Sequence, residues 1–170
     1  MFINRPQPDE YGSFFGRYVN EVSGNVLMEL ESQLPEVGNF LYSIPANKYN
    51  YAYAEGKWTV KELVGHLIDT ERIMAYRVLR FSRKDSTNLS GFEENDFVLN
   101  STFKTRDLTD LIEEFIAVRK SNLYLIKALT PEQLDLTGIA SNNKISVRAL
   151  VFIIAGHLIH HIKILKERYL

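Results

Sequence analysis

Two histidines near the end of the sequence, His157 and His161, have the spacing that most directly suggests chemistry. In an α-helix, side chains four positions apart lie on one face, with Cβ atoms roughly 5–6 Å apart. Two imidazoles placed in this way can bind one metal ion, for which Zn–N distances are about 2.0–2.1 Å. The alternative is a pair of partly buried histidines with a purely structural role.

One histidine, His66, lies outside this cluster, in a strongly helical and apolar segment. Three histidines on two helices, without an evident fourth protein ligand, predict a metal site with an open coordination position. A metal held there would lower the pKa of bound water or thiol and so provide a nucleophile near neutral pH. His160 lies about 60° around the helix from His157 and about 100° from His161, so it should point to a neighbouring helix or to solvent. It could also replace one of them as a ligand or support the site from outside.

Two charged residues near His66 are candidate catalytic groups. Asp69 follows His66 by three positions and could lie near the metal, with a solvated position at the edge of the helix as the alternative. Arg77 shares the face of His66 three turns later, where a guanidinium binds an anion or pairs with a carboxylate. Glu71 lies half a turn around from His66, so we expect it to form an ion pair on the surface.

Aromatic residues just before this helix, Tyr51, Tyr53 and Trp58, could also contact the site. We favour the interpretation that they cap the end of a helix bundle, and a wall of a substrate pocket is the alternative. The acidic stretch at residues 92–96 is interpreted as a solvated loop or a helix start. It belongs to a long polar connection, residues 84–105, which could form a lid over the site.

Apolar residues at helical spacing predict four long helices, at residues 25–41, 59–82, 107–129 and 146–168. Thr59 and Glu62 form a capping box at the start of the second helix, and Ser146 caps the fourth. Pro35 removes a backbone donor within the first helix. We therefore expect a kink or break near residues 31–33.

The remaining segments carry no pattern of alternating polar and apolar residues that would predict a strand. Residues 138–144 are expected to form a loop, and residues 1–12 an extended arm on the surface. The prediction is therefore an all-α protein with one domain, residues 1–170. Within it, residues 1–24 form the N-terminal arm and a short helix.

The depths of the histidines bear on the topology of the predicted four-helix bundle. His66 lies about two turns after the start of its helix, and His161 about two turns before the end of the last helix. These depths match if the two helices run antiparallel, as they do in an up-down-down-up bundle. That topology needs a long crossover between the second and third helices, and residues 84–105 are the longest connection. A simple up-down-up-down bundle would place the histidines at poorly matched depths.

Composition limits the classes of partner. The chain has 170 residues, 45% of them hydrophobic and 24% charged, with a net charge of −1 and no cysteine. This charge balance does not favour nucleic acid or an anionic membrane as a partner. The absence of cysteine excludes disulfides and thiolate ligands, so any thiol chemistry would need a substrate thiol. The N-terminus lacks an apolar signal core, and a cytoplasmic location is the expectation.

Several motifs together carry a resemblance to a known family: Lys57-Trp58-Thr59-Val60-Lys61-Glu62, then His66 with Asp69, and then Gly156-His157 with His161. Their combined spacing resembles the DinB-like superfamily, and within it the YfiT-like metal-dependent hydrolases, a branch that includes bacillithiol S-transferases. The resemblance implies an up-down-down-up bundle and a nickel or zinc ion bound by His66, His157 and His161. It further implies that Arg77 matches an arginine of this branch and that a homodimer is possible. Pro35 departs from the smooth first helix usual in the branch.

Three hypotheses for function follow. The leading one is a thiol S-transferase, in which the metal-bound thiolate of a low-molecular-weight thiol attacks an electrophilic small molecule. The alternative is a hydrolase that uses metal-bound water and needs a nearby base. Asp69 close to the metal would favour hydrolysis, whereas an open cleft lined by Arg77 would favour an anionic thiol. The third is a non-enzymatic, metal-binding helical module.

Overall fold

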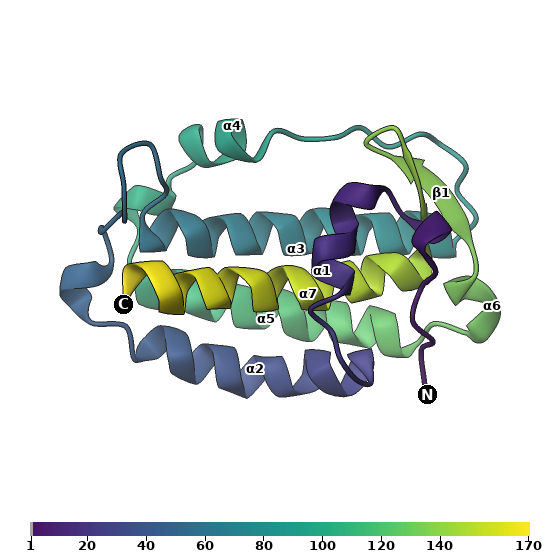
Figure 1. The fold of residues 1–170 in the computed structure, drawn as a ribbon, viewed down its shortest axis with the longest axis horizontal. Coiled ribbons are helices and arrows are strands. Elements are labelled where there is room, and N and C mark those ends of the chain that lie inside the picture. Colours follow the sequence, from purple (N-terminus) through teal and green to yellow (C-terminus); the bar gives the residue numbers. More distant parts are fainter. Residues whose placement is uncertain (1) are drawn as a thin grey trace.

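The computed structural model describes residues 2–170, and most of them are helical. The four long helices are α2 (Val26–Tyr42), α3 (Val60–Ser82), α5 (Leu108–Lys127) and α7 (Val147–Ile164), the last continuing as a π-helical turn at Leu165–Tyr169. Figure 1 shows α2 and α7 running in one direction and α3 and α5 in the other. The predicted four-helix bundle with up-down-down-up topology is therefore confirmed.

Each long helix packs against two others. α3 contacts α5 and α7, and α2 contacts the same two helices, so α2 and α3 lie diagonally opposite each other. The parallel neighbours α3 and α5 are joined by the crossover, which we define as residues 83–107. It contains α4 (Glu94–Leu99) and a short 3-10 turn at Phe103–Thr105. Figure 1 shows the crossover passing along the outside of α3.

The helices begin where the sequence predicts. The Thr59 hydroxyl accepts from the backbone N–H of Glu62 (3.3 Å), and the Glu62 carboxylate accepts from that of Thr59 (2.8 Å). Ser146 caps α7 by accepting from the backbone N–H of Ala149 at 3.0 Å. These bonds satisfy donors that a helix start leaves free. Both predicted caps are confirmed.

Helix α2 continues through Pro35, so a break near residues 31–33 is not found. Pro35 and Glu31 both lie on the exposed side of the helix. The carbonyl that loses its partner therefore faces water, which reduces the cost of the missing hydrogen bond. Leu30, Val37 and Leu41 remain buried, and their packing holds the two halves in one helix.

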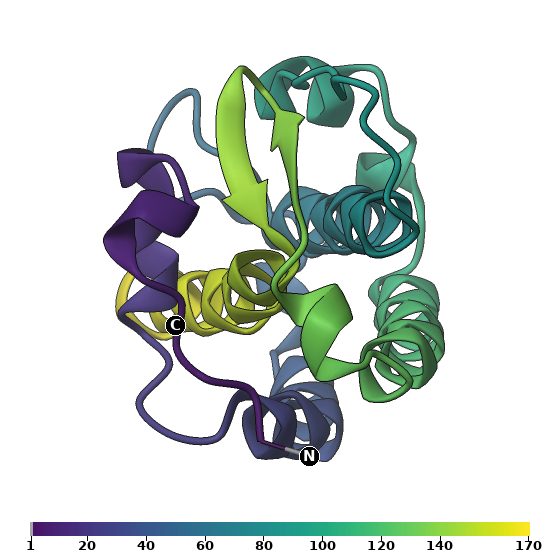
Figure 2. The same cartoon turned by 90° about the vertical axis from the view of Figure 1, so that its right-hand side faces the viewer.

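A short antiparallel hairpin corrects the expected loop at residues 138–144. Its strands are β1 (Thr137–Ala140) and β2 (Asn143–Ser146), with Gly138 opposite Ile145. The turn residues Ser141 and Asn142 have φ values of 52° and 61°, which match the left-handed turns of two-residue hairpins. Strands of four residues are too short to show alternation, so the sequence pattern missed them. Figure 2 shows the hairpin beside the crossover.

The N-terminal segment, residues 2–24, contains two 3-10 turns, Pro8–Glu10 and Ser13–Phe15, followed by α1 (Gly16–Val19). It packs on α7, as Figure 2 shows. Ile3 and Tyr18 are buried, so the segment is fixed in the core as well as lying on the surface. The predicted short helix is present as the single turn of α1.

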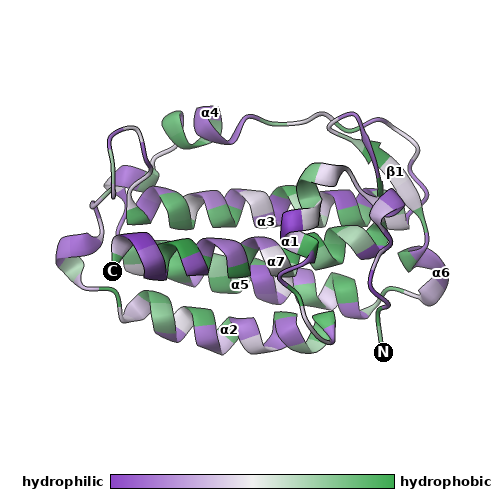
Figure 3. Cartoon of the chain, viewed as in Figure 1, coloured by the Kyte–Doolittle hydropathy of each residue, from purple (hydrophilic) through white to green (hydrophobic). Residues whose placement is uncertain are grey.

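Helix α7 forms the apolar centre of the bundle. Its length and composition alone would allow a membrane span, but most of the apolar stretch is buried within the protein. Figure 3 shows that its apolar residues concentrate in the half that follows the hairpin. Three neighbours, α1, α2 and α3, cover it. Such burial is typical of the core helix of a helical bundle.

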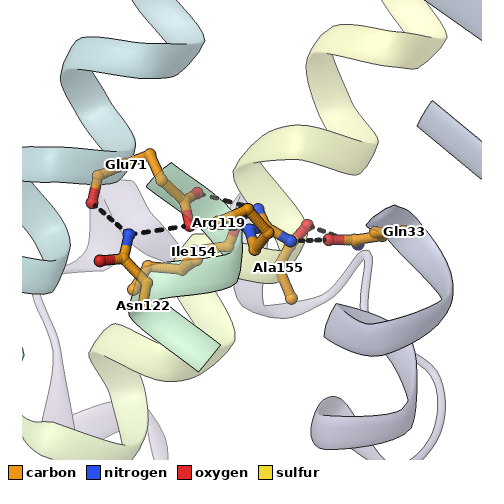
Figure 4. A network of polar contacts seen from close by, with 6 residues as sticks. All are labelled: Gln33, Glu71, Arg119, Asn122, Ile154 and Ala155. Carbon is orange, nitrogen blue, oxygen red and sulfur yellow. Dashed lines mark hydrogen bonds and ion pairs between the residues drawn. The ribbon is translucent and has the colours of Figure 1, made fainter. Parts of the chain in front are cut away.

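A buried polar network joins all four long helices (Figure 4). Arg119 of α5 is fully buried and donates to both carboxylate oxygens of Glu71 of α3, at 2.7 and 2.9 Å. It also donates to Gln33 of α2 at 2.6 Å, and Gln33 donates to the carbonyl of Ala155 in α7 at 3.1 Å. Glu71 was expected on the surface; its position half a turn from His66 instead faces α5.

The buried pair should be costly to break on one side. We expect Arg119→Met to lower the free energy of unfolding by about 3–5 kcal/mol, because Glu71 is left as an unpaired buried charge. Adding Glu71→Met should recover a large part of this loss. Lys127→Met, which removes the half-exposed pair with Glu31, is the control and should cost less than about 1 kcal/mol. Urea unfolding of the wild type and the three variants measures these losses, and equal losses for Arg119→Met and Lys127→Met would contradict the expectation.

Candidate metal centre

The three predicted metal ligands meet in the middle of the bundle. His66 of α3 and His157 and His161 of α7 each offer one ring nitrogen, and these atoms lie within 4.8 Å of one another. The Nε2 atoms of His66 and His157 are 3.0 Å apart. Two nitrogens bound to one tetrahedral zinc ion lie roughly 3.3 Å apart, given Zn–N bonds of about 2.0–2.1 Å. The separation therefore suits a shared metal ion.

Burial keeps these imidazoles neutral. His66, His157 and His161 are 2%, 6% and 9% exposed. Burial lowers the pKa of His66 to about 4, and burial with the neighbouring histidines lowers the pKa values of His157 and His161 well below the ordinary value. Neutral imidazole is the form that binds a metal.

One ring nitrogen of the three histidines lacks a partner. Nδ1 of His161 is buried and has no hydrogen-bond partner within residues 2–170. Leaving a buried nitrogen unpaired costs free energy unless a ligand compensates for it. Three neutral imidazoles facing one point, with an unpaired nitrogen among them, fit a bound divalent metal ion.

His160 stands outside this group of three. Its ring contacts Tyr18 edge-to-face at 5.4 Å and His161 at 5.2 Å between ring centroids. It is partly exposed. The expected orientation, towards a neighbouring segment or solvent, agrees with this position.

Two glycines allow covering segments to approach the histidines closely. A Cβ on Gly156, just before His157, would lie 1.8 Å from the carbonyl oxygen of Tyr18. A Cβ on Gly65, just before His66, would lie 2.2 Å from the ring of Phe103 in the crossover. The N-terminal segment and the crossover therefore pack directly beside the site, where a larger residue would clash.

Trp58 contacts the site as well as the end of the bundle. Its ring lies 4.6 Å from that of His66 between centroids, and its carbonyl accepts from the Tyr169 hydroxyl at 2.8 Å. Trp58 also lines a cavity of about 280 Å³ that includes Tyr53, Glu94 and His161. We call this the tyrosine-side cavity; Trp58 therefore packs at the end of the bundle and also lines a cavity beside His66.

The crossover contributes a carboxylate that sequence analysis missed. Glu94, the first residue of α4, places Oε2 3.9 Å from Nε2 of His66. Burial raises the pKa of the Glu94 carboxyl group, which is 48% exposed. Of the two alternatives for residues 92–96, a solvated loop or a helix start, the helix start is present. No sequence spacing relates it to the histidines, because only the path of the crossover brings them together.

A second cavity lies on the other side of the histidines. This hairpin-side cavity has a volume of about 360 Å³, and its lining includes Thr70, Phe92, Ser141 and His157. Glu94 and Asn95 line both cavities, His161 lines the first and His157 the second, so both cavities reach the three-histidine centre. A third groove, of about 380 Å³ between α2 and α7, includes none of the three histidines.

The two candidate catalytic residues lie outside the group of three histidines. Asp69 is half-buried, and its pKa is raised by burial, with Arg72 and Glu114 as its charged neighbours. Arg77 is buried and donates to the carbonyl of Ser90 at 3.2 Å and the hydroxyl of Ser141 at 3.0 Å. Burial lowers the pKa of Arg77. Arg77 thus ties α3 to the crossover and the hairpin turn, and neither residue belongs to the group of three histidines.

Comparisons with known proteins agree with this architecture. A sequence profile of the DinB superfamily matches residues 29–165. A relative from Oceanobacillus iheyensis, named "Putative metal-dependent hydrolase", is 25% identical over 141 residues, which are 82% of this chain and 81% of the relative. YfiT from Bacillus subtilis, described as a probable metal-dependent hydrolase with an unusual four-helix bundle topology, has a TM-score of 0.73 and 17% identity, covering 96% of this chain and 90% of YfiT. The likeness to YfiT supports the fold.

The metal-free protein should lose stability as the pH falls below about 6.5. The folded state keeps His66 neutral down to its pKa of about 4, whereas the unfolded state takes up a proton near pH 6.5. Stability therefore rises with pH across this window, and at pH 5 the loss for His66 alone is roughly 2 kcal/mol. Urea unfolding in chelator at pH 7 and pH 5 measures it. His66→Gln should flatten the dependence, and an unchanged slope would contradict the assignment.

Proposed function

The chain belongs to the DinB superfamily, and we propose that it is a metal-dependent hydrolase that acts on a small molecule. The observation that carries this proposal is Glu94, whose carboxylate lies 3.9 Å from Nε2 of His66 at the edge of the three-histidine centre. Hydrolysis needs a base beside the nucleophile. Glu94 can fill this role. From the sequence, Asp69 was the candidate for it.

The proposed ligands are His66, His157 and His161, and the proposed metal is zinc or nickel, both of which suit neutral imidazole nitrogens. A divalent ion bound there would lower the pKa of a coordinated water and polarise a carbonyl oxygen. The three imidazoles contribute no charge of their own at neutral pH, because burial keeps them unprotonated. This leaves the full charge of the ion available for the reaction.

Glu94 would accept the proton of the nucleophile and pass it to the leaving group. Its distance from His66 is longer than a hydrogen bond, which leaves room for an intervening group, and such contacts often tighten only when substrate binds. Its partial burial raises the pKa of the carboxyl group, which makes it a better base than an exposed glutamate. Trp58 packs against His66 and lines the tyrosine-side cavity together with Glu94.

Thiol S-transfer is the second candidate, and one observation favours it. Two cavities meet at the histidines, which would suit two separate substrates, a low-molecular-weight thiol and an electrophile. The chain has no cysteine of its own, so a substrate thiol would have no competitor for the metal. Glu94 would then accept the proton of the thiol. In either case we propose a cytoplasmic enzyme whose partner is a small molecule.

Metal analysis tests the ligand set. Tag-free wild-type protein should retain close to one equivalent of zinc or nickel after dialysis, as measured by elemental analysis. His161→Ala should lose most of this metal, because two remaining imidazoles bind far more weakly. His160→Ala is the matched control and should retain it. Wild type that stays metal-free even after refilling would contradict the metal-dependent function.

A carboxamide at position 94 tests the base. Glu94→Gln should retain its metal but hydrolyse a generic ester such as para-nitrophenyl acetate roughly 100- to 10,000-fold more slowly. Glu93→Gln, one residue earlier in the crossover, should have a much smaller effect.

Parallel assays with monochlorobimane and either glutathione, cysteine or coenzyme A test thiol transfer. Metal-dependent conjugation without ester hydrolysis would select the S-transferase instead.

A further inference from the structure

The last turn of the helix that carries His157 and His161 is wider than the rest of it. Leu165–Tyr169 form a π-helical turn, a conformation that is rare and that often occurs at functional sites. Tyr169 is 2% exposed, and its ring packs edge-to-face against that of Tyr53, with 5.0 Å between the centroids. This turn therefore places a buried tyrosine eight residues after the proposed ligand His161.

A hydrogen bond connects Tyr169 to the start of α3. The Tyr169 hydroxyl donates to the backbone carbonyl of Trp58 at 2.8 Å. Burial raises the pKa of Tyr169 to about 12, so the hydroxyl stays protonated and remains a donor. Trp58 directly precedes Thr59, the residue that caps α3. The bond therefore ties the end of α7 to the start of the helix that carries His66.

The indole of Trp58 packs on His66. The two rings are tilted by 37°, and their centroids are 4.6 Å apart. A metal-binding histidine is usually oriented by a hydrogen bond from the ring nitrogen that does not bind the metal. In the described part of the chain, the polar contacts of the His66 ring are made by Nε2, to His157 and Glu94. Apart from the other two histidines, Trp58 is therefore the aromatic neighbour that can hold this imidazole in place.

We propose that Tyr169 is a positioning residue of the metal centre. Its hydrogen bond to the Trp58 carbonyl fixes the indole over His66. The indole in turn keeps Nε2 of His66 directed at the position that the three histidines share. Helix α7 thus supplies two of the ligands and also carries the residue that orients the third. This inference rests on the metal-dependent function proposed above.

Removing one hydroxyl tests this role in the metal-free protein. Trp58 is the only tryptophan of the chain, so tryptophan fluorescence reports on its surroundings alone. Tyr169→Phe keeps the ring and loses the hydrogen bond. We expect the Trp58 emission to move to longer wavelength and its quenching by acrylamide to increase, because the indole is held less firmly. Tyr51→Phe, in the same aromatic cluster, is the matched control and should behave as wild type.

Zinc affinity measures the effect on the site itself. In a competition titration with a chromophoric chelator, Tyr169→Phe should bind zinc roughly 3- to 10-fold more weakly than wild type, the value of one hydrogen bond. Tyr51→Phe should bind zinc as wild type does. In cobalt-substituted protein, the visible absorption bands report the geometry of the ligands, and they should shift in Tyr169→Phe. A residue that only stabilised the fold would change neither quantity in the folded protein.

A second variant shows whether the effect passes through the indole. Trp58→Ala removes the indole and keeps the backbone carbonyl, so the hydrogen bond from Tyr169 can still form. In this background, Tyr169→Phe should cause no further loss of zinc affinity, although it should still lower the melting temperature. An equal loss of zinc affinity in both backgrounds would overturn the proposal, because Tyr169 would then act independently of Trp58.

The outcomes separate the positioning role from the metal-dependent function. If wild type binds zinc and Tyr169→Phe binds it equally well, the positioning role is wrong and the metal-dependent function stands, whether or not the emission or the melting temperature changes. If wild type binds no zinc, the metal-dependent function itself fails, and the positioning role of Tyr169 fails with it.

Discussion

The buried ion pair between Arg119 and Glu71 fixes the geometry on which the site depends. Both charges are removed from water, so the pair is tolerable only when its hydrogen bonds are completed. Arg119 uses its remaining donors on Gln33 and, at 3.5 Å, on the carbonyl of Ile154. Glu71 lies five residues after His66, and Ile154 lies three residues before His157. The network therefore sets how far α3 and α7 can rotate or slide, and with them the histidines.

The topology explains how a carboxylate reaches this site. Parallel neighbours α3 and α5 cannot be joined by a short turn, so the chain must return along the bundle in a long crossover. Arg77 and the backbone bonds of Leu89 to the hairpin fix its first half. Phe103, packed where Gly65 leaves space, fixes its end. Between these two anchors the crossover places Glu94 beside His66. A connection that the topology requires thus also provides a candidate base.

The parts of the fold that follow from local rules could be predicted from sequence. The i, i+4 histidines, the caps and the matching depths of His66 and His161 led to the observed bundle. Other features depend on contacts between distant segments, and these were not predictable. Glu71 looks like a surface residue until Arg119 of another helix is placed opposite it. Glu94 shows no spacing relative to the histidines, and the four-residue strands carry too little pattern.

The charges around the site bear on which nucleophile it uses. Glu93 and Glu94 face the hairpin-side cavity, and both would repel an anionic thiol on its way to the histidines. Exposed Arg17 offsets part of this repulsion. Its positive charge acts on both Glu94 and His157, where it opposes the rise that burial causes in the Glu94 pKa and adds slightly to the fall in the His157 pKa. Water carries no charge to be repelled, and in the proposed hydrolase Glu94 would take its proton. The two carboxylates therefore support the proposal of hydrolysis over transfer of an anionic thiol.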